Sequence, residues 1–205
     1  AECLEFYIDL YGPKEMDSNQ RLGFIQKQDQ TGLSNGIMAS IFNAGGLPQK
    51  AWPLYRDAVK CIVERDCSQL QIPFWNGENF SGKTIVFRRE PGPTDEILYS
   101  MIFHELIEVG CKVIIEVDSR LLKIFEISFP DAEIVPRNNP PHPRLLMTDI
   151  DYQANFSDPF ELMRNELNKY PKHNGYLKAD PKTSSHWEKY LNKVSNKPKV
   201  GVSWG

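Results

Sequence analysis

The loop at residues 88–95 carries most of the side chains that could do chemistry. It holds two arginines, Arg88 and Arg89, and two acids, Glu90 and Asp95. A carboxylate such as Asp95 could take the proton from a hydroxyl group while the hydroxyl oxygen attacks an electrophilic carbon. The simpler interpretation is that Asp95 offsets the dipole of a helix that begins here, because acids are common in a first turn. The residue types therefore predict either a general base or a helix-stabilising acid.

The other charged residues of this loop also have two interpretations each. Glu90 could bind a hydroxyl group of a ligand or pair with a neighbouring arginine, and we favour a solvated ion pair within the loop. Arg88 and Arg89 could hold an acidic ligand or a phosphate group. Because side chains alternate along a strand, only one of the two arginines can face such a ligand.

The elements on either side of this loop form a strand–loop–helix–strand unit. Residues 84–87 are apolar and mostly β-branched, which predicts a buried strand. Two prolines and a glycine at 88–94 end the strand. Thr94 is the expected N-cap of a helix over 95–109, and 112–117 is the next strand. Such a unit joins parallel strands by a right-handed crossover. We therefore expect an α/β fold with a Rossmann-like parallel sheet, whose ligands bind beyond the carboxyl ends of the strands.

The rest of the chain shows weaker patterns. Residues 1–36 are poorly patterned, whereas 37–70 predict two short helices that break at 45–48. This pair resembles a single degenerate tetratricopeptide-type unit, which must pack on the α/β domain or on repeats absent from this sequence, because one unit is not stable alone. A linker follows at 72–78. The later patterns predict, in order, a helix at 119–129, a strand at 132–135, a loop at 136–143, a strand within 144–153, a helix near 159–167 and a helix at 181–194.

These patterns divide the chain into three parts. A helical N-terminal segment is expected at 1–71 and the Rossmann-like domain at 72–198. The run Lys-Val-Gly-Val-Ser-Trp near the end indicates a further strand. We interpret 199–205 as the start of a second, truncated α/β domain.

Composition excludes several classes of protein. The net charge of −3 gives no general attraction to nucleic acid, and 40% hydrophobic residues is ordinary for a soluble protein. No apolar run approaches the roughly 20 residues of a membrane span, and no leader marks secretion, so we predict a cytoplasmic protein. The four cysteines lack the spacing of metal ligands, and no G-x-G-x-x-G follows a strand. No metal or bound cofactor is expected.

Three motifs in order carry a resemblance to a known family. They are Trp-Asn-Gly-Glu at 75–78, Ser-Gly-Lys-Thr at 81–84 and Glu-Pro-Gly-Pro-Thr-Asp-Glu at 90–96. This succession resembles the pattern of bacterial tetratricopeptide-linked, glycosyltransferase family 9-like proteins, which are similar to the lipopolysaccharide heptosyltransferases. The segments 175–181 and 199–204 look like the crossover of that family into a C-terminal domain. The resemblance extends from about residue 45 to the end of the chain.

The resemblance implies a GT-B architecture, in which two Rossmann-like domains face each other across a cleft. The N-terminal domain binds the acceptor, the C-terminal domain binds the nucleotide-sugar donor, and no metal is bound. By position Asp95 would be the general base. The side chains or backbone that shape the acceptor pocket would be Arg89, Glu90, Gly92 and Thr94. Thr94 stands where the family has a glycine, and Pro91 stands where it has a glutamine.

The resulting expectation is the acceptor-side half of a glycosyltransferase, inactive without its donor domain. It would move a sugar from a nucleotide-sugar to a hydroxyl of an acceptor glycan, a lipid-linked sugar or a protein. The alternative is a non-catalytic Rossmann-like module that binds another protein through its helical pair.

Overall fold

The fold is built on a four-stranded sheet in which all strands are parallel. The computed structural model describes residues 17, 20, 33–67, 70–88, 90, 92–172, 175–195 and 197–202, with only the backbone described for 33–34 and 60–67. The strands are β1 (Thr84–Arg88), β2 (Lys112–Val117), β3 (Glu133–Pro136) and β4 (Tyr152–Asn155), in the order β3-β2-β1-β4. The prediction of an α/β fold with a parallel, Rossmann-like sheet flanked by helices is confirmed.

The strand order creates a switch point between β1 and β4. The chain moves from β1 to β2 and then to β3, and it returns to the other side of β1 to form β4. Phe87 of β1 is in register with Ile115 of β2 on one side and with Ala154 of β4 on the other. The connections after β1 and β4 therefore leave the sheet at the same edge and diverge, which is where open parallel sheets bind ligands.

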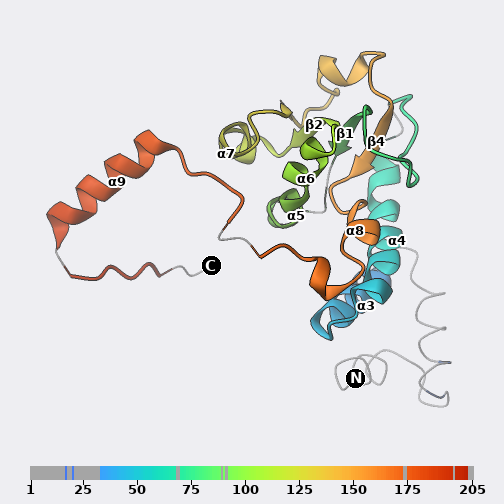
Figure 1. Cartoon of the computed structure of the whole chain (residues 1–205), viewed down its shortest axis with the longest axis horizontal. Coiled ribbons are helices and arrows are strands. Elements are labelled where there is room, and N and C mark those ends of the chain that lie inside the picture. The colour runs from blue at the N-terminus through green and yellow to red at the C-terminus, as the bar shows by residue number, and fades with distance from the viewer. Residues whose placement is uncertain are drawn as a thin grey trace.

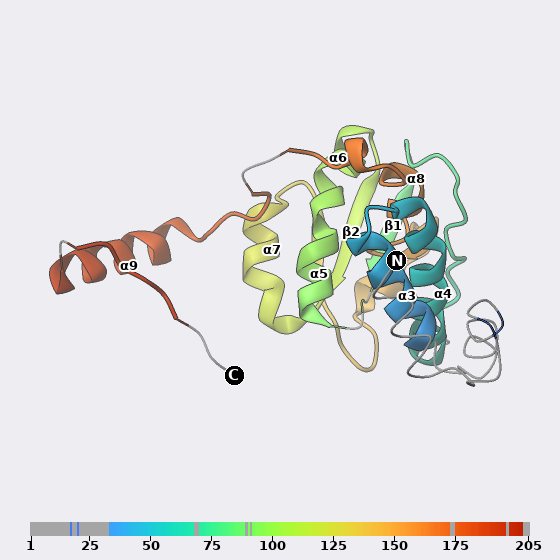
Figure 2. The ribbon, with the colours of Figure 1, turned by 90° about the horizontal axis from the view of Figure 1, so that it is seen from below.

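Three helices and one 3₁₀ turn cover one face of the sheet. They are α5 (Pro93–Tyr99), the turn Ser100–Ile102, α6 (Phe103–Glu108) and α7 (Leu122–Ser128), and Figure 2 shows α5 and α7 lying side by side over the strands. The expected single helix over 95–109 is thus divided into α5 and α6. The core beneath is rich in aromatic rings, with Phe103, Phe125, Phe129 and Phe156 all fully buried. These rings pack with Phe87 of β1 and Ile115 of β2, so they hold the helices against this face of the sheet.

The opposite face of the sheet is covered more thinly. Val86, Ile114 and Val135 lie on this face and pack against Leu70, Leu145 and Ile150. The cover comes from the chain near residues 70–72 and from a 3₁₀ turn at Pro143–Leu146. Polar side chains follow this apolar row toward the carboxyl ends of the strands, and they belong to the site described below.

A pair of helices packs beside β4. The pair consists of α3 (Leu33–Ala44) and α4 (Pro48–Cys67), and Gly46 between them has a φ of 72°, a conformation that favours glycine. Trp52 of α4 is 4% exposed, contacts the rings of Tyr99 and Phe160, and donates to the carbonyl of Arg164 at 2.9 Å. The expected break and the expected packing on the α/β body are confirmed, whereas the tetratricopeptide likeness of this pair stays a prediction.

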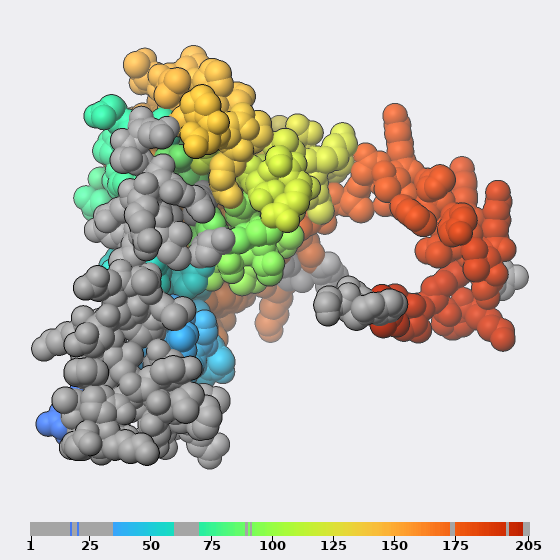
Figure 3. Space-filling model, turned by 180° about the vertical axis from the view of Figure 1, so that it is seen from behind, coloured from blue at the N-terminus to red at the C-terminus, as the bar shows by residue number. Residues whose placement is uncertain are grey.

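The C-terminal arm leaves the body of the molecule. After the short helix α8 (Phe160–Met163) and an extended stretch, α9 (Pro181–Val194) stands away from the sheet (Figures 1 and 3). The predicted bounds of α9 are confirmed, and Asp180 caps it by accepting from the amide of Thr183 at 2.8 Å. Residues 197–202 form no strand, Ser203 to Gly205 lie outside the described residues, and the expected second domain from 199 stays a prediction. No described helix is long and apolar enough to cross a membrane.

Candidate functional site

The candidate site lies where the chain leaves β1 and β4 at the carboxyl edge of the sheet. Arg88, the last residue of β1, is in register with Asn155, the last residue of β4. The loop after β1 leads through Glu90 to α5, and the loop after β4 leads through Ser157 to α8. These two loops meet directly, because the amide of Ser157 donates to a carboxylate oxygen of Glu90 at 2.8 Å. The site is therefore formed by segments about 70 residues apart in the chain.

Helix α5 begins two residues earlier than the sequence predicted. Its N-cap is Gly92 and its first residue is Pro93, so the prediction that Thr94 is the N-cap is wrong. A residue that precedes proline is restricted to extended backbone, and Gly92 has φ −152° and ψ 165°. Proline itself suits the first helical position because its missing N–H has no helical partner there. Thr94 is consequently exposed on the first turn.

Asp95 is the predicted base, and its side chain is partly buried in the first turn of α5. Burial raises the pKa of Asp95 above its ordinary value, while a hydrogen bond from the backbone of Gly92 acts in the opposite direction. Within the described part of the chain, no lysine, arginine or histidine forms an ion pair with Asp95. Its carboxylate thus combines partial exposure with a raised proton affinity, which is what a general base requires.

Glu90 is fully buried, in contrast to the solvated ion pair that we favoured from the sequence. One carboxylate oxygen accepts from the Ser157 amide and the other accepts from the hydroxyl of Tyr55 at 3.1 Å. Desolvation raises the pKa of Glu90 to about 8 despite these hydrogen bonds. Glu90 therefore holds a proton in much of the population at neutral pH, and it lies beneath the loop rather than in solvent.

Two tyrosines extend this buried cluster toward Asp95. The ring of Tyr55 lies edge-on to that of Tyr99, with centroids 5.3 Å apart. Burial raises the pKa of both hydroxyl groups, and the negative charges of Glu90 and Asp95 add to the effect. Both hydroxyl groups therefore stay protonated, and that of Tyr55 donates to Glu90. Through its contacts with Glu90 and Tyr99, Tyr55 joins α4 to the loop after β1 and to α5.

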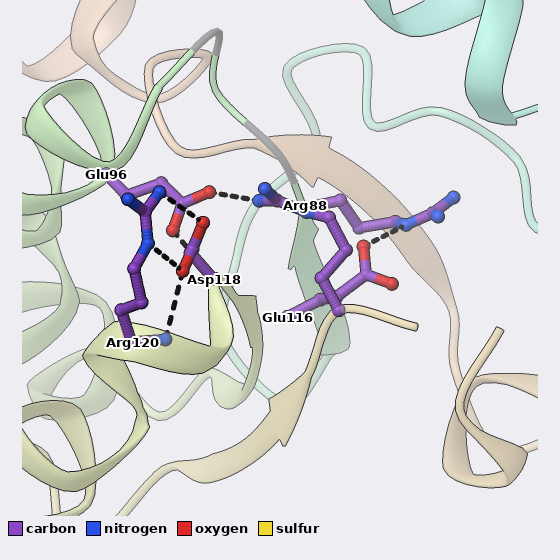
Figure 4. Close-up of polar contacts among 6 residues, drawn as sticks. Arg88, Glu96, Glu116, Asp118 and Arg120 are labelled. Atoms are coloured by element: carbon purple, nitrogen blue, oxygen red, sulfur yellow. Dashed lines mark hydrogen bonds and ion pairs between the residues drawn. The ribbon is translucent and has the colours of Figure 1, made fainter. Parts of the chain in front are cut away.

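The arginine at the end of β1 points away from this cluster. Arg88 lies on the thinly covered face, where its Nε donates to Glu116 at 3.0 Å (Figure 4). Its Nη1 donates to Gln153 at 3.1 Å. Both members of this ion pair are buried, with side chains 9% and 2% exposed. Arg88 is therefore held by the neighbouring strands and is not free to bind a phosphate. Arg89, the other predicted ligand-binding arginine, lies outside the described residues.

A second charged network anchors the start of α5 to the end of β2. Glu96 is fully buried, accepts from the amide of Asp118 at 2.9 Å and pairs with Arg137. Asp118 in turn accepts from Arg120 at 2.9 Å, and this contact lowers the pKa of Asp118 (Figure 4). The two adjacent acids of α5 thus differ in burial: Glu96 is fully buried and paired at the sheet edge, and Asp95 is partly exposed.

Sequence reasoning missed the residues that α4 and β4 contribute. Tyr55 was only one residue of the helices predicted within 37–70, and the predicted strand within 144–153 ended before the run Asn-Phe-Ser-Asp at 155–158. That run includes Asp158, whose carboxylate accepts from the Asn155 amide at 2.7 Å and whose pKa is raised to about 6 by desolvation. The signal that could have identified Asp158 is the group of three polar residues among the four at 155–158, which follow an alternating strand. Among the described residues, no group of three His, Cys, Asp or Glu side chains could hold a metal ion.

Comparison with known proteins gives one distant relative. The chain is 27% identical over 180 residues to protein FlbA of Caulobacter vibrioides. The match covers 81% of this chain and 30% of FlbA, so the chain spans less than a third of the length of that protein. No protein-family model matches the chain, and no solved structure matches it. The site above is therefore interpreted from its own geometry and from the resemblance carried by residues 75–96.

Proposed function

We propose that this chain is the acceptor-side domain of a glycosyltransferase of the GT-B type and that Asp95 is its general base. The observation that carries the proposal is the position of Asp95. It is a partly exposed carboxylate with a raised pKa, beyond the carboxyl end of the central strand β1 and next to the switch point. The motifs at 75–96 and the parallel sheet that follows them support the same assignment.

The reaction needs a proton acceptor for the attacking hydroxyl group and a separate binding site for the nucleotide-sugar donor. The acceptor hydroxyl gives its proton to a carboxylate oxygen of Asp95, and the hydroxyl oxygen forms a bond to the anomeric carbon of the donor sugar. The bond from that carbon to the phosphate oxygen breaks, and the nucleoside diphosphate leaves with its electron pair. A nucleotide-sugar donor would be held by a second domain. The acceptor would be a glycan, a lipid-linked sugar or a protein.

The loop around Asp95 would position the acceptor. Gly92 presents its backbone beside Asp95, since a Cβ atom added there would lie 3.7 Å from the nearer carboxylate oxygen. Thr94 is exposed one residue before the base and would contact the acceptor, as would Arg89. Glu90 would shape the pocket from below, because it joins the loop to Tyr55 and Ser157.

The test is a transfer assay on the gene product that carries this chain. A panel of nucleotide-sugars with a radiolabelled sugar is incubated with acceptors extracted from the source cells, and incorporated label is counted. We expect Asp95→Asn to reduce transfer by about 10²- to 10⁴-fold. Glu108→Gln is the matched control, because Glu108 is exposed at the far end of α6. Equal transfer by wild type and Asp95→Asn, with both proteins folded, would refute the role of Asp95.

A second candidate function is a protein-binding module without catalysis. The apolar side of α9 favours it, because Trp187, Tyr190 and Leu191 are 54%, 53% and 39% exposed. Exposed apolar groups on one side of a helix are typical of surfaces that another protein covers. The assay above separates the two candidates: absence of transfer with every donor, in a folded wild-type protein, would favour the binding module.

A further inference from the structure

A cavity of about 460 Å³ opens beside the carboxyl end of β4, and the proposed base does not line it. Three segments form its walls: α4 through Arg56, the stretch 74–77, and the turn from Asn155 to α8. We call this cavity the Trp75 pocket. Its volume lies in the range of small-molecule sites.

The aromatic wall of the pocket is held in place by β4. The amide of Trp75 donates to the carbonyl of Gln153 at 2.8 Å, and the amide of Gln153 donates to the carbonyl of Pro73 at 2.9 Å. One face of the Trp75 indole stacks on Phe80, with centroids 4.6 Å apart, and its Nε1 donates to the carbonyl of Glu78. Phe74 beside it is 46% exposed. The pocket thus has a rigid, partly uncovered aromatic surface before any ligand arrives.

The polar wall contains an acceptor that lacks a partner. Asn155 is 4% exposed, and its side-chain Oδ1 is buried without a hydrogen-bond partner. The Nδ2 of the same amide points to a carboxylate oxygen of Asp158 at 3.5 Å. A buried polar atom without a partner costs free energy, so a native structure that retains one commonly reserves it for a ligand or a water molecule. A ligand that donates a hydrogen bond to this oxygen would remove that cost.

The other side chains that line the pocket determine which class of ligand fits. Asp57, Asp158 and Glu161 add acceptors, while Arg56, which pairs with Glu161, and the side-chain amide of Asn76 add donors. Because Arg56 is paired with Glu161, the other two acids would also attract an organic cation, which the test below separates from a sugar. Hydroxyl groups both donate and accept, so they match a wall of mixed character. A pyranose ring also offers an apolar C–H face that packs on aromatic rings.

We propose that the Trp75 pocket binds a sugar ring and that this ring belongs to the acceptor. The second part of this inference rests on the proposed function, whereas the binding of a sugar ring does not. Phe74 and Trp75 contact the C–H face of the ring, and Asn155 and Asp158 accept from its hydroxyl groups. Because Ser157 binds Glu90, the turn that lines the pocket is the same turn that supports the loop of Asp95.

The test is saturation-transfer NMR on the 205-residue chain with glucose, galactose, mannose and N-acetylglucosamine, and with sorbitol as an open-chain polyol. We expect at least one ring sugar to bind and sorbitol to give no signal. Phe74→Ala should weaken that binding at least fivefold. Tyr190→Ala, which removes an equally exposed ring on α9, should leave it unchanged. Asn155→Leu, which removes the unpartnered acceptor, should abolish the signal, and circular dichroism establishes that each variant is folded.

Several results would overturn the inference: no ring sugar binds, sorbitol binds equally well, or Phe74→Ala leaves the affinity unchanged. Binding of arginine or spermidine in place of sugars would show a cation site instead. The proposed function fails separately from this inference. Sugar binding without transfer from any donor would support the sugar site and refute the transferase. Transfer that Phe74→Ala does not alter would support the transferase and refute the role of the Trp75 pocket as its acceptor site.

Discussion

The carboxyl edge of the sheet has two halves that treat their acids differently. On the side of β2 and β3, each buried or partly buried acid is paired with an arginine, as in Glu116 with Arg88 and Glu96 with Arg137. On the side of β4, Glu90, Asp95 and Asp158 form no ion pair with any residue that the structure describes. Both halves lie at the carboxyl edge of the same four-stranded parallel sheet.

The difference teaches where to look for function. Paired charges between strands fix the geometry of an edge, because each partner satisfies the other. Burial raises the pKa of acids in both halves, Glu96 included, and without an ion pair the pKa reaches about 8 for Glu90 and about 6 for Asp158. Perturbed acids beside a cavity are typical of active sites, and of these acids Asp158 lines the Trp75 pocket. We therefore assign a structural role to the β2–β3 half and a chemical role to the β4 half, and each assignment makes a measurable prediction.

The largest expected effect is in the structural half. Arg88→Met removes the cation that compensates buried Glu116 and also a donor to Gln153. We expect the free energy of unfolding to fall by about 3–5 kcal/mol, because a charge is left buried without a partner. Urea unfolding followed by circular dichroism measures this change.

The control for this variant replaces both members of the pair. The double variant Arg88→Met/Glu116→Leu leaves no buried charge, so most of the lost stability should return. A single variant that is as stable as wild type would show that the pair does not hold this half of the edge, and the contrast between the halves would then be lost.

The sequence predicted the frame of this edge but not the partners of its acids. The strand at 84–87, the crossover helix and α9 follow from local spacing, capping and turn residues, which act over a few positions. Glu90, in contrast, is buried by Tyr55 and Ser157, which lie 35 and 67 residues away in the chain. No local pattern contains that information. The N-cap was misplaced at Thr94 because a capping side chain was given more weight than the restriction that Pro93 imposes on Gly92.

A smaller effect is expected at Glu90, and it should depend on pH. The pKa of Glu90 is about 8 in the folded protein and about 4.5 ordinarily. Between these values the folded state keeps a proton that the unfolded state releases, so the free energy of unfolding falls as pH rises. Glu90→Gln mimics the protonated acid and lacks this titration. From pH 5 to pH 8, wild type should lose about 2–4 kcal/mol more than the variant.

Urea unfolding at pH 5, 6, 7 and 8 tests this expectation. Glu126→Gln serves as the control, because Glu126 is exposed on α7 and should leave the pH dependence of wild type intact. Parallel curves for wild type and Glu90→Gln would mean that Glu90 is ionised in the folded protein, and the difference between the two halves of the edge would shrink accordingly.

The smallest effect on stability is expected at Gly92, where the effect on function should be larger. Its φ of −152° is open to any residue, and an added Cβ atom would meet nothing closer than Asp95 at 3.7 Å. Gly92→Ala should therefore change the free energy of unfolding by no more than about 0.5 kcal/mol, because a slightly poorer N-cap is offset by a less flexible unfolded chain. If the acceptor approaches the backbone beside Asp95, the added methyl group occupies its place, and transfer should fall at least tenfold. Full transfer activity in Gly92→Ala would mean that the acceptor does not cross this part of the loop, and the β4 half would keep only its pocket as a site.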